Sequence, residues 1–294
     1  MTDAVRTPDQ LLEGLPDFPF APHYRELDGF RLAHIDEGDG PPVIFFHGEP
    51  TWSFLWRKVI PPVRDAGFRC IAPDMAGFGR SDKPMDLDWY SYDRHVVTMA
   101  PLLEELDVKD ATVVVHDWGG PVGLRLAVEH PDRIARMVIL DTGLFTGHQK
   151  MTEAWTAFRN FVEQSEDLPV GFLVKGACLR DPGDEVVAAY DAPYPSAASK
   201  AGARAFPLLI PTAPDQPGAE AGQRVLDTLR EDARPKLILW ADSDPVLPLE
   251  TGRKFAAALG TEVGHVIEGA SHFLQEDAGS QIGALIADWL GQAA

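Results

Sequence analysis

The chain has 294 residues, of which 45% are hydrophobic and 24% charged, and its formal net charge is -19 at pH 7. This composition is typical of a globular protein and excludes a disordered or fibrous chain. Because so acidic a protein repels phosphate groups, we expect neither nucleic acid nor an anionic membrane surface as a partner.

Strand-like and helix-like patterns alternate from about residue 30 to residue 141. Short apolar or alternating runs predict five strands: RLAHIDEG (31–38), PVIFFHG (42–48), FRCIAPD (68–74), ATVVVHD (111–117) and RMVILD (136–141). Helical patterns cover 53–67, 92–106 and 118–130. We expect Pro61 and Pro62 to bend or break the first of these helices, and Pro101 weakens the second. The order of elements predicts a parallel sheet with helices on both faces.

From about residue 147 to 222 the strand patterns vanish, and helical pieces alternate with proline-rich turns. This segment is too long for a connection inside a compact α/β domain. The alternation then returns with a strand in PKLILWADSD (235–244), a helix in 250–260, a short strand within 261–272 and a helix in 280–290. We therefore predict a doubly wound core made of residues 1–146 and 223–294, with a helical cap, 147–222, inserted in it.

The amino-terminal residues and the cysteines indicate the cellular compartment in which we expect the protein. The start MTDAVRTPDQ lacks the basic flank and apolar run of a signal peptide, and no apolar stretch approaches the roughly 20 residues of a membrane-spanning helix. Cys70 and Cys178 lack metal-ligand spacing and are typical of free thiols in a reducing compartment. We expect a cytoplasmic protein and, by default, a monomer.

Reactive side chains follow four of the predicted strands, in His47-Gly48-Glu49-Pro50, Asp117-Trp118, Asp242-Ser243-Asp244 and Ser271-His272. Ligands of open α/β sheets bind outside the carboxyl ends of the strands. These strand ends are therefore expected to form one site, with the cap closing over it.

Asp117 lies between a strand and a helix, in the context of a nucleophile elbow, and Gly119 and Gly120 leave space on the helix side. A carboxylate is already ionised and can attack without a base. At an sp³ carbon that bears a leaving group, it would form an alkyl ester. The alternative is that Asp117 only caps the helix.

His272 follows the last core strand, where an α/β-hydrolase places its base. A carboxylate should orient its ring, and we rank Asp244 first, then Asp141, then Asp242. Backbone N–H groups of Glu49 and Trp118 are positioned to form an oxyanion hole. The Glu49 side chain needs water or a partner beside a catalytic carboxylate, and it could hold the hydrolytic water.

These stretches resemble the α/β-hydrolase superfamily and, within it, the haloalkane dehalogenases. The likeness runs from about residue 40 to 280 through HGEPTWSFLWRKVIPP (47–62), APDMAGFGRSDKP (72–84), VVVHDWGGPVGLRLA (113–127), YDAPYP (190–195), AGARAFP (201–207) and GASHFLQED (269–277). HGEPTW together with DWGG is fairly specific, whereas GFGRSDKP is shared with many α/β-hydrolases.

The resemblance implies an α/β-hydrolase fold and roles for single residues. Asp117 would displace halide from a haloalkane to give an alkyl ester, His272 supported by Asp244 would activate the water that opens it, and a primary alcohol would leave. Trp118 and Trp155 would bind the halide through their indole N–H groups. Phe158, Phe161 and Phe172 line the pocket or form the core of the cap.

The resemblance also implies the reaction partners, and two residues of the chain depart from the family pattern. The partners are a small halogenated alkane, water and halide ion, and neither a metal nor an organic cofactor is needed. Asp141 stands where an uncharged residue is expected, and His116 where a different polar residue is common.

Two other functions fit parts of the pattern. An epoxide hydrolase shares the fold, the Asp nucleophile and the His base, and would use cap tyrosines, for which Tyr190 and Tyr194 are candidates. Fluoroacetate-type dehalogenation is disfavoured because no arginine follows Asp117 to bind a carboxylate. A non-catalytic small-ligand binding protein on the same fold is the alternative from another class.

Overall fold

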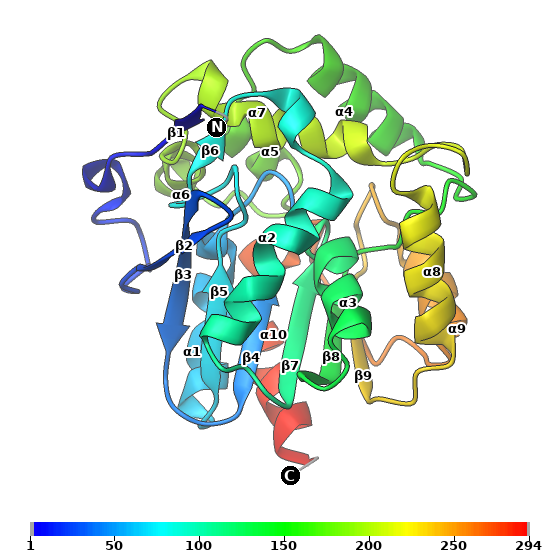
Figure 1. Ribbon diagram of the computed structural model, residues 1–294. Helices are drawn as coiled ribbons and strands as arrows, with labels where there is room; N and C mark the ends of the chain where they lie inside the picture. Colours follow the sequence, from blue (N-terminus) through cyan, green and yellow to red (C-terminus); the bar gives the residue numbers. More distant parts are fainter. Residues whose placement is uncertain (1–2, 293–294) are drawn as a thin grey trace.

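An eight-stranded sheet forms the centre of the molecule (Figure 1). The computed structural model describes residues 3–292. The strands lie in the order β10-β9-β8-β7-β4-β5-β3-β2, and their bounds are β2 His23–Leu27, β3 Phe30–Glu37, β4 Pro42–Phe46, β5 Arg69–Pro73, β7 Ala111–His116, β8 Ile134–Leu140, β9 Lys236–Ala241 and β10 His265–Ile267. The strands from β10 to β5 are parallel, whereas β3 and β2 are antiparallel to their neighbours. The predicted mostly parallel sheet is confirmed.

Helices cover both faces of this sheet, as Figure 1 shows, with α2, α3 and α8 on one face and α1 and α10 on the other. Their bounds are α1 Ile60–Asp65, α2 Tyr92–Glu105, α3 Gly119–Glu129, α8 Ala219–Arg230, α9 Leu249–Ala258 and α10 Leu274–Gln292. In α2 the buried residues follow helical spacing and form one mostly apolar face: Tyr92, His95, Val96, Thr98, Met99, Leu102 and Leu103. Because both faces are covered, β7 is buried along its whole length, which explains its run of β-branched residues.

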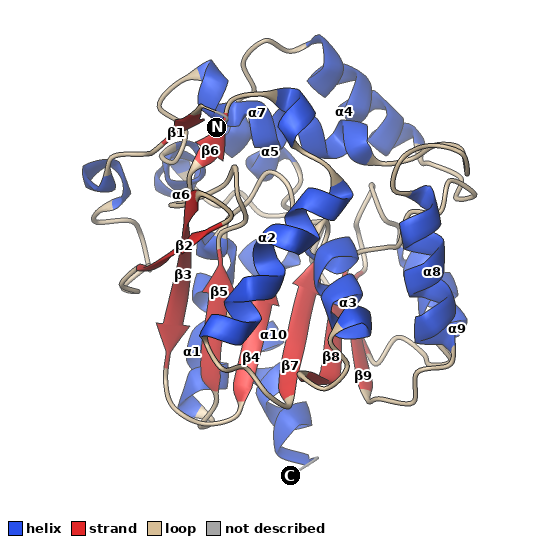
Figure 2. Ribbon diagram, viewed as in Figure 1, coloured by secondary structure: helices blue, strands red, loops and turns tan. Residues whose placement is uncertain are grey.

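The remaining helices lie above the carboxyl ends of the parallel strands (Figures 1 and 2). They are α4 Glu153–Gln164, α5 Val170–Gly176, α6 Asp184–Asp191 and α7 Ala201–Ala205. Between residues 141 and 235 the structure has no strand, as the sequence pattern predicts. The exact boundaries of core and cap stay a prediction.

The pairing register of the parallel strands places their carboxyl ends at the same level of the sheet. Phe46 pairs with Val115, His116 with Leu140, and Leu140 with Leu239. The residues that follow β4, β7, β8 and β9 therefore lie along one edge of the sheet, below the cap.

The structure differs from the sequence prediction in several places. The segment 53–67 is a 3₁₀ helix, Ser53–Lys58, followed by α1, so the break comes at Val59 and the two prolines lie in the first turn of the second helix. Proline is tolerated there because the first turn lacks intrahelical N–H partners. Helix α10 is kinked at Ala278 (φ -142°), and the segment after the kink contains the predicted helix 280–290, whereas the turn before it was not predicted. Strand β2 and the two-residue strands β1 (Ala4–Val5) and β6 (Lys83–Pro84) were not predicted either. The two-residue strands are too short to show an alternating pattern, and β2 (HYREL) is mostly polar and mostly not buried.

A buried polar cluster joins the cap to the core. Arg57 binds Glu276 through both terminal nitrogens, at 2.5 and 2.7 Å, and the Tyr190 hydroxyl from α6 donates to Glu276 Oε1 at 2.6 Å. Burial alone would raise the pKa of Glu276, but hydrogen bonds and charge from Arg57, with the Tyr190 hydrogen bond, lower it. We call Arg57, Lys58, Tyr190 and Glu276 the cap–core cluster, since Lys58 also contacts Glu276 at 3.2 Å.

Among residues 3–292, no helix is both long and apolar enough to cross a membrane.

Candidate active site

Asp117 occupies a strained turn between β7 and α3. Its φ is +47°, in the left-handed region that side chains other than glycine rarely adopt. The glycines that follow serve close packing: a Cβ on Gly119 would lie 2.1 Å from Phe46 O, and one on Gly120 would lie 1.9 Å from Thr142 Oγ1. The turn therefore needs small residues after Asp117, while Asp117 itself carries the strain.

The Asp117 carboxylate accepts hydrogen bonds from two backbone groups. Its Oδ1 accepts from Glu49 N at 2.7 Å, and the Trp118 N–H also binds it. His272 Nε2 lies 3.6 Å from Oδ2, longer than a hydrogen bond. Burial alone would raise the pKa of Asp117, but the nearby His272, with smaller contributions from His116 and Trp118, lowers it. Asp117 is thus an ionised carboxylate at neutral pH.

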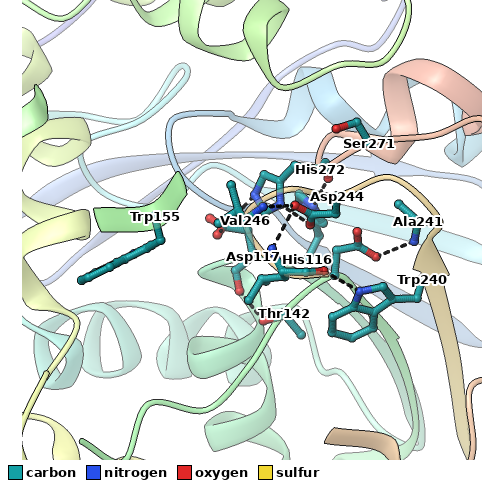
Figure 3. Close-up of polar contacts among 12 residues, drawn as sticks. His116, Asp117, Thr142, Trp155, Trp240, Ala241, Asp244, Val246, Ser271 and His272 are labelled. Carbon is teal, nitrogen blue, oxygen red and sulfur yellow. Dashed lines mark hydrogen bonds and ion pairs between the residues drawn. The ribbon is translucent and has the colours of Figure 1, made fainter. Parts of the chain in front are cut away.

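His272 is held by Asp244 on the side away from Asp117 (Figure 3). Its Nδ1 lies 2.7 Å from Asp244 Oδ2. The other oxygen, Asp244 Oδ1, accepts from the backbone N–H groups of Val246 (2.7 Å) and Leu247 (3.0 Å). Burial alone would lower the pKa of His272, but the charges of Asp244 and Asp117 and the hydrogen bond to Asp244 raise it well above 6.5. The first-ranked acid, Asp244, is therefore the one in contact with the ring.

The other two candidate acids take different places. Asp242 accepts from Gly269 N at 3.0 Å and Ala270 N at 3.3 Å, so it ties down the loop before His272 instead of contacting the ring. Asp141 is fully buried behind Asp244, and its Oδ1 accepts from Ala241 N at 2.9 Å.

His116 contacts the site in a way the sequence pattern did not predict. Its Nε2 lies 2.8 Å from the backbone oxygen of His272, so the ring nitrogen donates to that carbonyl. Burial and the nearby His272 lower the pKa of His116 to about 4, which keeps the ring neutral. Its position just before Asp117 was the available signal.

A cavity of about 300 Å³ opens above Asp117 and His272. Its polar side chains are Asp117, His272 and Glu49, and the other lining residues are apolar or glycine: Pro50, Trp118, Phe145, Met151, Trp155, Phe158, Phe172, Leu173, Gly176, Ala177, Pro207, Ile210, Pro245, Val246, Leu247 and Phe273. Phe158 and Phe172 thus line the cavity, whereas Phe161 does not and is 44% exposed.

Both expected tryptophans line this cavity. Trp118 is buried at its floor, and its indole nitrogen has no hydrogen-bond partner among the described residues. Trp155 extends from α4, and Figure 3 shows it across from Asp117 and His272. The Thr152 hydroxyl accepts from Trp155 N at 3.1 Å and so caps the helix that carries it. A free indole N–H in an apolar cavity is suited to an anion.

Glu49 contributes a second carboxyl group to the cavity. It is 5% exposed, and its Oε1 has no hydrogen-bond partner within the described part of the chain. Burial and the charge of Asp117 raise the pKa of Glu49 well above 4.5, although His272 opposes this. Burial and the charge of Asp117 therefore favour the neutral form of the Glu49 carboxyl.

The cap tyrosines lie elsewhere. Tyr190 donates to Glu276 in the cap–core cluster, and Tyr194 is buried outside the cavity lining. Among the described residues no tyrosine lines the cavity.

Comparison with known proteins places this geometry in context. Residues 41–279 match the family model described as the alpha/beta hydrolase fold. The chain is 41% identical to a haloalkane dehalogenase of Mycolicibacterium paratuberculosis, covering 97% of each chain, and 39% identical to one of Psychrobacter cryohalolentis, again covering 97% of each. Among solved structures, it resembles the tetrameric haloalkane dehalogenase DpaA of Paraglaciecola agarilytica with a TM-score of 0.91 at 34% identity, covering 96% of this chain and 97% of that one.

Proposed function

The chain belongs to the haloalkane dehalogenase family, and we propose from this membership and from its active site that it hydrolyses haloalkanes to a primary alcohol and halide. One observation carries the proposal: an ionised Asp117 lies at the floor of an apolar cavity that two tryptophans also line.

In the first step, Asp117 attacks the carbon that bears the halogen. Oδ1 is held by the Glu49 N–H, so Oδ2 is the freer oxygen and forms the new carbon–oxygen bond. The carbon–halogen bond breaks with its electron pair on the halide. The indole N–H groups of Trp118 and Trp155 bind this anion in place of water. The product of this step is an alkyl ester of Asp117.

In the second step, water attacks the carboxyl carbon of the ester. His272 accepts the proton of the water, and Asp244 stabilises the imidazolium. The oxyanion that forms is bound by the backbone N–H groups of Glu49 and Trp118. Collapse of the intermediate breaks the acyl–oxygen bond, and the alcohol leaves with the proton from His272. The Asp117 carboxylic acid that remains releases the second proton of the water to solvent, which restores the carboxylate.

The order of these steps suits the charge balance of the site. While Asp117 is ionised, its charge is one of the two that raise the pKa of His272. Esterification removes that charge, so the pKa of His272 falls at the stage where a neutral base is needed. Formation of the alkyl ester thus favours the neutral His272 that its hydrolysis requires.

The cavity favours a small, uncharged substrate. Its volume of about 300 Å³ lies at the lower end of the range for ligand sites, roughly 300–1,000 Å³. Its lining holds no lysine or arginine that could bind a carboxylate, so haloacids are poor candidates. The epoxide hydrolase alternative lacks its tyrosine donors, since Tyr190 is bound to Glu276.

Location and assembly stay predictions. A cytoplasmic, monomeric enzyme is our expectation, although the Paraglaciecola relative is described as tetrameric. Light scattering coupled to size-exclusion chromatography measures the mass in solution and decides between the two states.

The experiment that tests the function is intact-mass spectrometry of His272→Phe after incubation with a short bromoalkane and, separately, with a small epoxide. Without its base the enzyme should accumulate the ester, so the bromoalkane should add one alkyl group at Asp117. The exposed His265 offers a matched control, because His265→Phe should turn over normally and trap nothing. An adduct with the epoxide alone would assign an epoxide hydrolase, and no adduct with either would favour a binding protein.

A further inference from the structure

Asp141 is a buried carboxyl group that the two proposed steps do not use. It follows β8, is 0% exposed and has a φ of +23°. Its backbone oxygen accepts from the N–H of Asp117 at 3.2 Å, and its Oδ1 accepts from Ala241 N at 2.9 Å. Asp141 is thus joined to both the nucleophile turn and β9.

The second carboxyl oxygen of Asp141 lacks the kind of partner that the first one has. Oδ2 is buried, and it has no N–H or hydroxyl donor among residues 3–292. The Asp141 and Asp244 carboxyl groups follow the neighbouring strands β8 and β9 and lie close enough for the charge of Asp244 to raise the pKa of Asp141. Two buried carboxyl groups this close cannot both stay ionised, because the like charges repel in a medium of low polarity. The pair must share one proton.

The hydrogen-bond partners decide which group carries the proton. Asp244 accepts from two backbone N–H groups and from His272 Nδ1, all of which favour its charged form. Asp141 accepts from a single N–H, that of Ala241. The charge therefore belongs on Asp244 and the proton on Asp141. The pKa directions agree: burial and the charge of Asp244 raise the pKa of Asp141, and His272 outweighs burial to lower that of Asp244.

We propose that Asp141 is a neutral carboxylic acid that donates its proton in a hydrogen bond to Asp244 and so positions the carboxylate that orients His272. Asp141 touches neither substrate nor the reacting atoms, so it is a positioning residue. This inference rests on the proposed function, because it assigns Asp141 to the second step, in which His272 is the base.

The surroundings keep this arrangement in place. The other titratable groups around the pair are His272 on the far side of Asp244, His116 at the end of β7, and Asp117 beyond His272. Neutral Asp141 leaves one negative charge on the pair to balance a protonated His272. A second charge there would hold the proton on His272 and remove the base.

The test uses two substitutions of different character. Asp141→Asn keeps an N–H donor toward Asp244 and an oxygen for Ala241 N–H, whereas Asp141→Leu has similar size and removes both. Loss of a hydrogen bond to a charged group should slow ester hydrolysis by about 10- to 100-fold in Asp141→Leu. Alkylation of Asp117 should be unchanged, because it needs no base. Rapid-quench intact-mass measurement with a bromoalkane should therefore show ester accumulating in Asp141→Leu, and hydrolysis within about threefold of wild type in Asp141→Asn.

Infrared difference spectroscopy tests the proton directly and needs no turnover. The wild-type minus Asp141→Asn spectrum at pH 7 should contain the C=O stretch of a neutral carboxyl group. Asp288 is exposed on α10, and the same difference with Asp288→Asn should lack that band.

Several outcomes would overturn the proposal. One is the absence of the neutral-carboxyl band, which would place a charge on Asp141. Equal slowing of both steps in Asp141→Leu, with a lowered melting temperature, would assign Asp141 a purely structural role. Equal damage by Asn and Leu would show that the donor is not what matters. If wild type forms no ester and releases no halide, the proposed function fails and the role in the second step fails with it, while the infrared band still decides where the proton lies.

Discussion

Two buried polar clusters in this molecule contrast in how their groups are partnered. In the cap–core cluster, both carboxylate oxygens of Glu276 accept hydrogen bonds, and its charge is balanced by Arg57 and Lys58. At the strand ends, by contrast, buried polar atoms of Glu49, Trp118 and Asp141 find no donor or acceptor of the usual kind among the described residues. Such atoms also occur elsewhere, Arg57 Nε among them, but those of Glu49 and Trp118 belong to residues that line the cavity, where a ligand can contact them.

The two clusters also differ in what they connect. Glu276 and Arg57 are almost wholly inaccessible, and their cluster joins α6 of the cap to the core. Asp117 keeps 18% of its side-chain surface accessible, and that surface lines the cavity. We therefore expect substitutions in the cap–core cluster to change stability and substitutions at the strand ends to change chemistry.

The largest expected effect is on chemistry alone. Asp117→Ala removes the nucleophile, and halide release from a bromoalkane should fall by at least about a thousandfold. The variant should be as stable as wild type or more so, because alanine removes a charge that is buried beside an apolar cavity. Halide release is measured by ion chromatography and stability by urea unfolding. Turnover above a few per cent of wild type would exclude Asp117 as the nucleophile.

The second effect is on stability alone. Arg57→Leu leaves the Glu276 carboxylate buried with Lys58 and Tyr190 but without its main partner, and this should lower the free energy of unfolding by about 3–5 kcal/mol. The double variant Arg57→Leu/Glu276→Leu should regain much of that loss, since no uncompensated charge remains. Folded Arg57→Leu should release halide at the wild-type rate. A stable variant with impaired halide release would instead connect this cluster to the reaction.

The two clusters could be predicted from the sequence to different extents, because they leave different patterns in it. The active-site residues stand at the ends of strongly apolar strands, so Asp117, Asp244 and His272 could be placed at one edge from strand order. Arg57 and Glu276 are 219 positions apart and lie within helices. Nothing in their local pattern predicts that they meet, because the contact depends on how α10 packs against the segment of residues 53–65.

The same reasoning explains the partial predictions within the site. Asp141 ranked among three candidate acids because each follows a strand, and only packing in space decides which one touches His272. The nearness of Asp141 to Asp244 depends on the pairing of β8 with β9, with Leu140 opposite Leu239. Cap side chains were hardest to place: Phe158 and Phe172 line the cavity while Phe161 does not, since short helices between proline-rich turns leave their rotation unspecified.

The smallest expected effect is on halide binding at the cap side of the cavity. The substitution should leave stability and nucleophilic attack unchanged. Trp155→Phe keeps an aromatic ring against the apolar lining but removes the indole N–H. Loss of one hydrogen bond to an anion should weaken bromide binding by about tenfold or somewhat more. Quenching of the remaining tryptophan fluorescence by bromide measures the affinity, and urea unfolding should show little change. Trp289→Phe on α10 is the matched control, since Trp289 does not line the cavity. Unchanged bromide affinity in Trp155→Phe would leave Trp118 as the sole indole donor from the sequence-predicted pair, and would assign Trp155 to packing of the cap against the cavity.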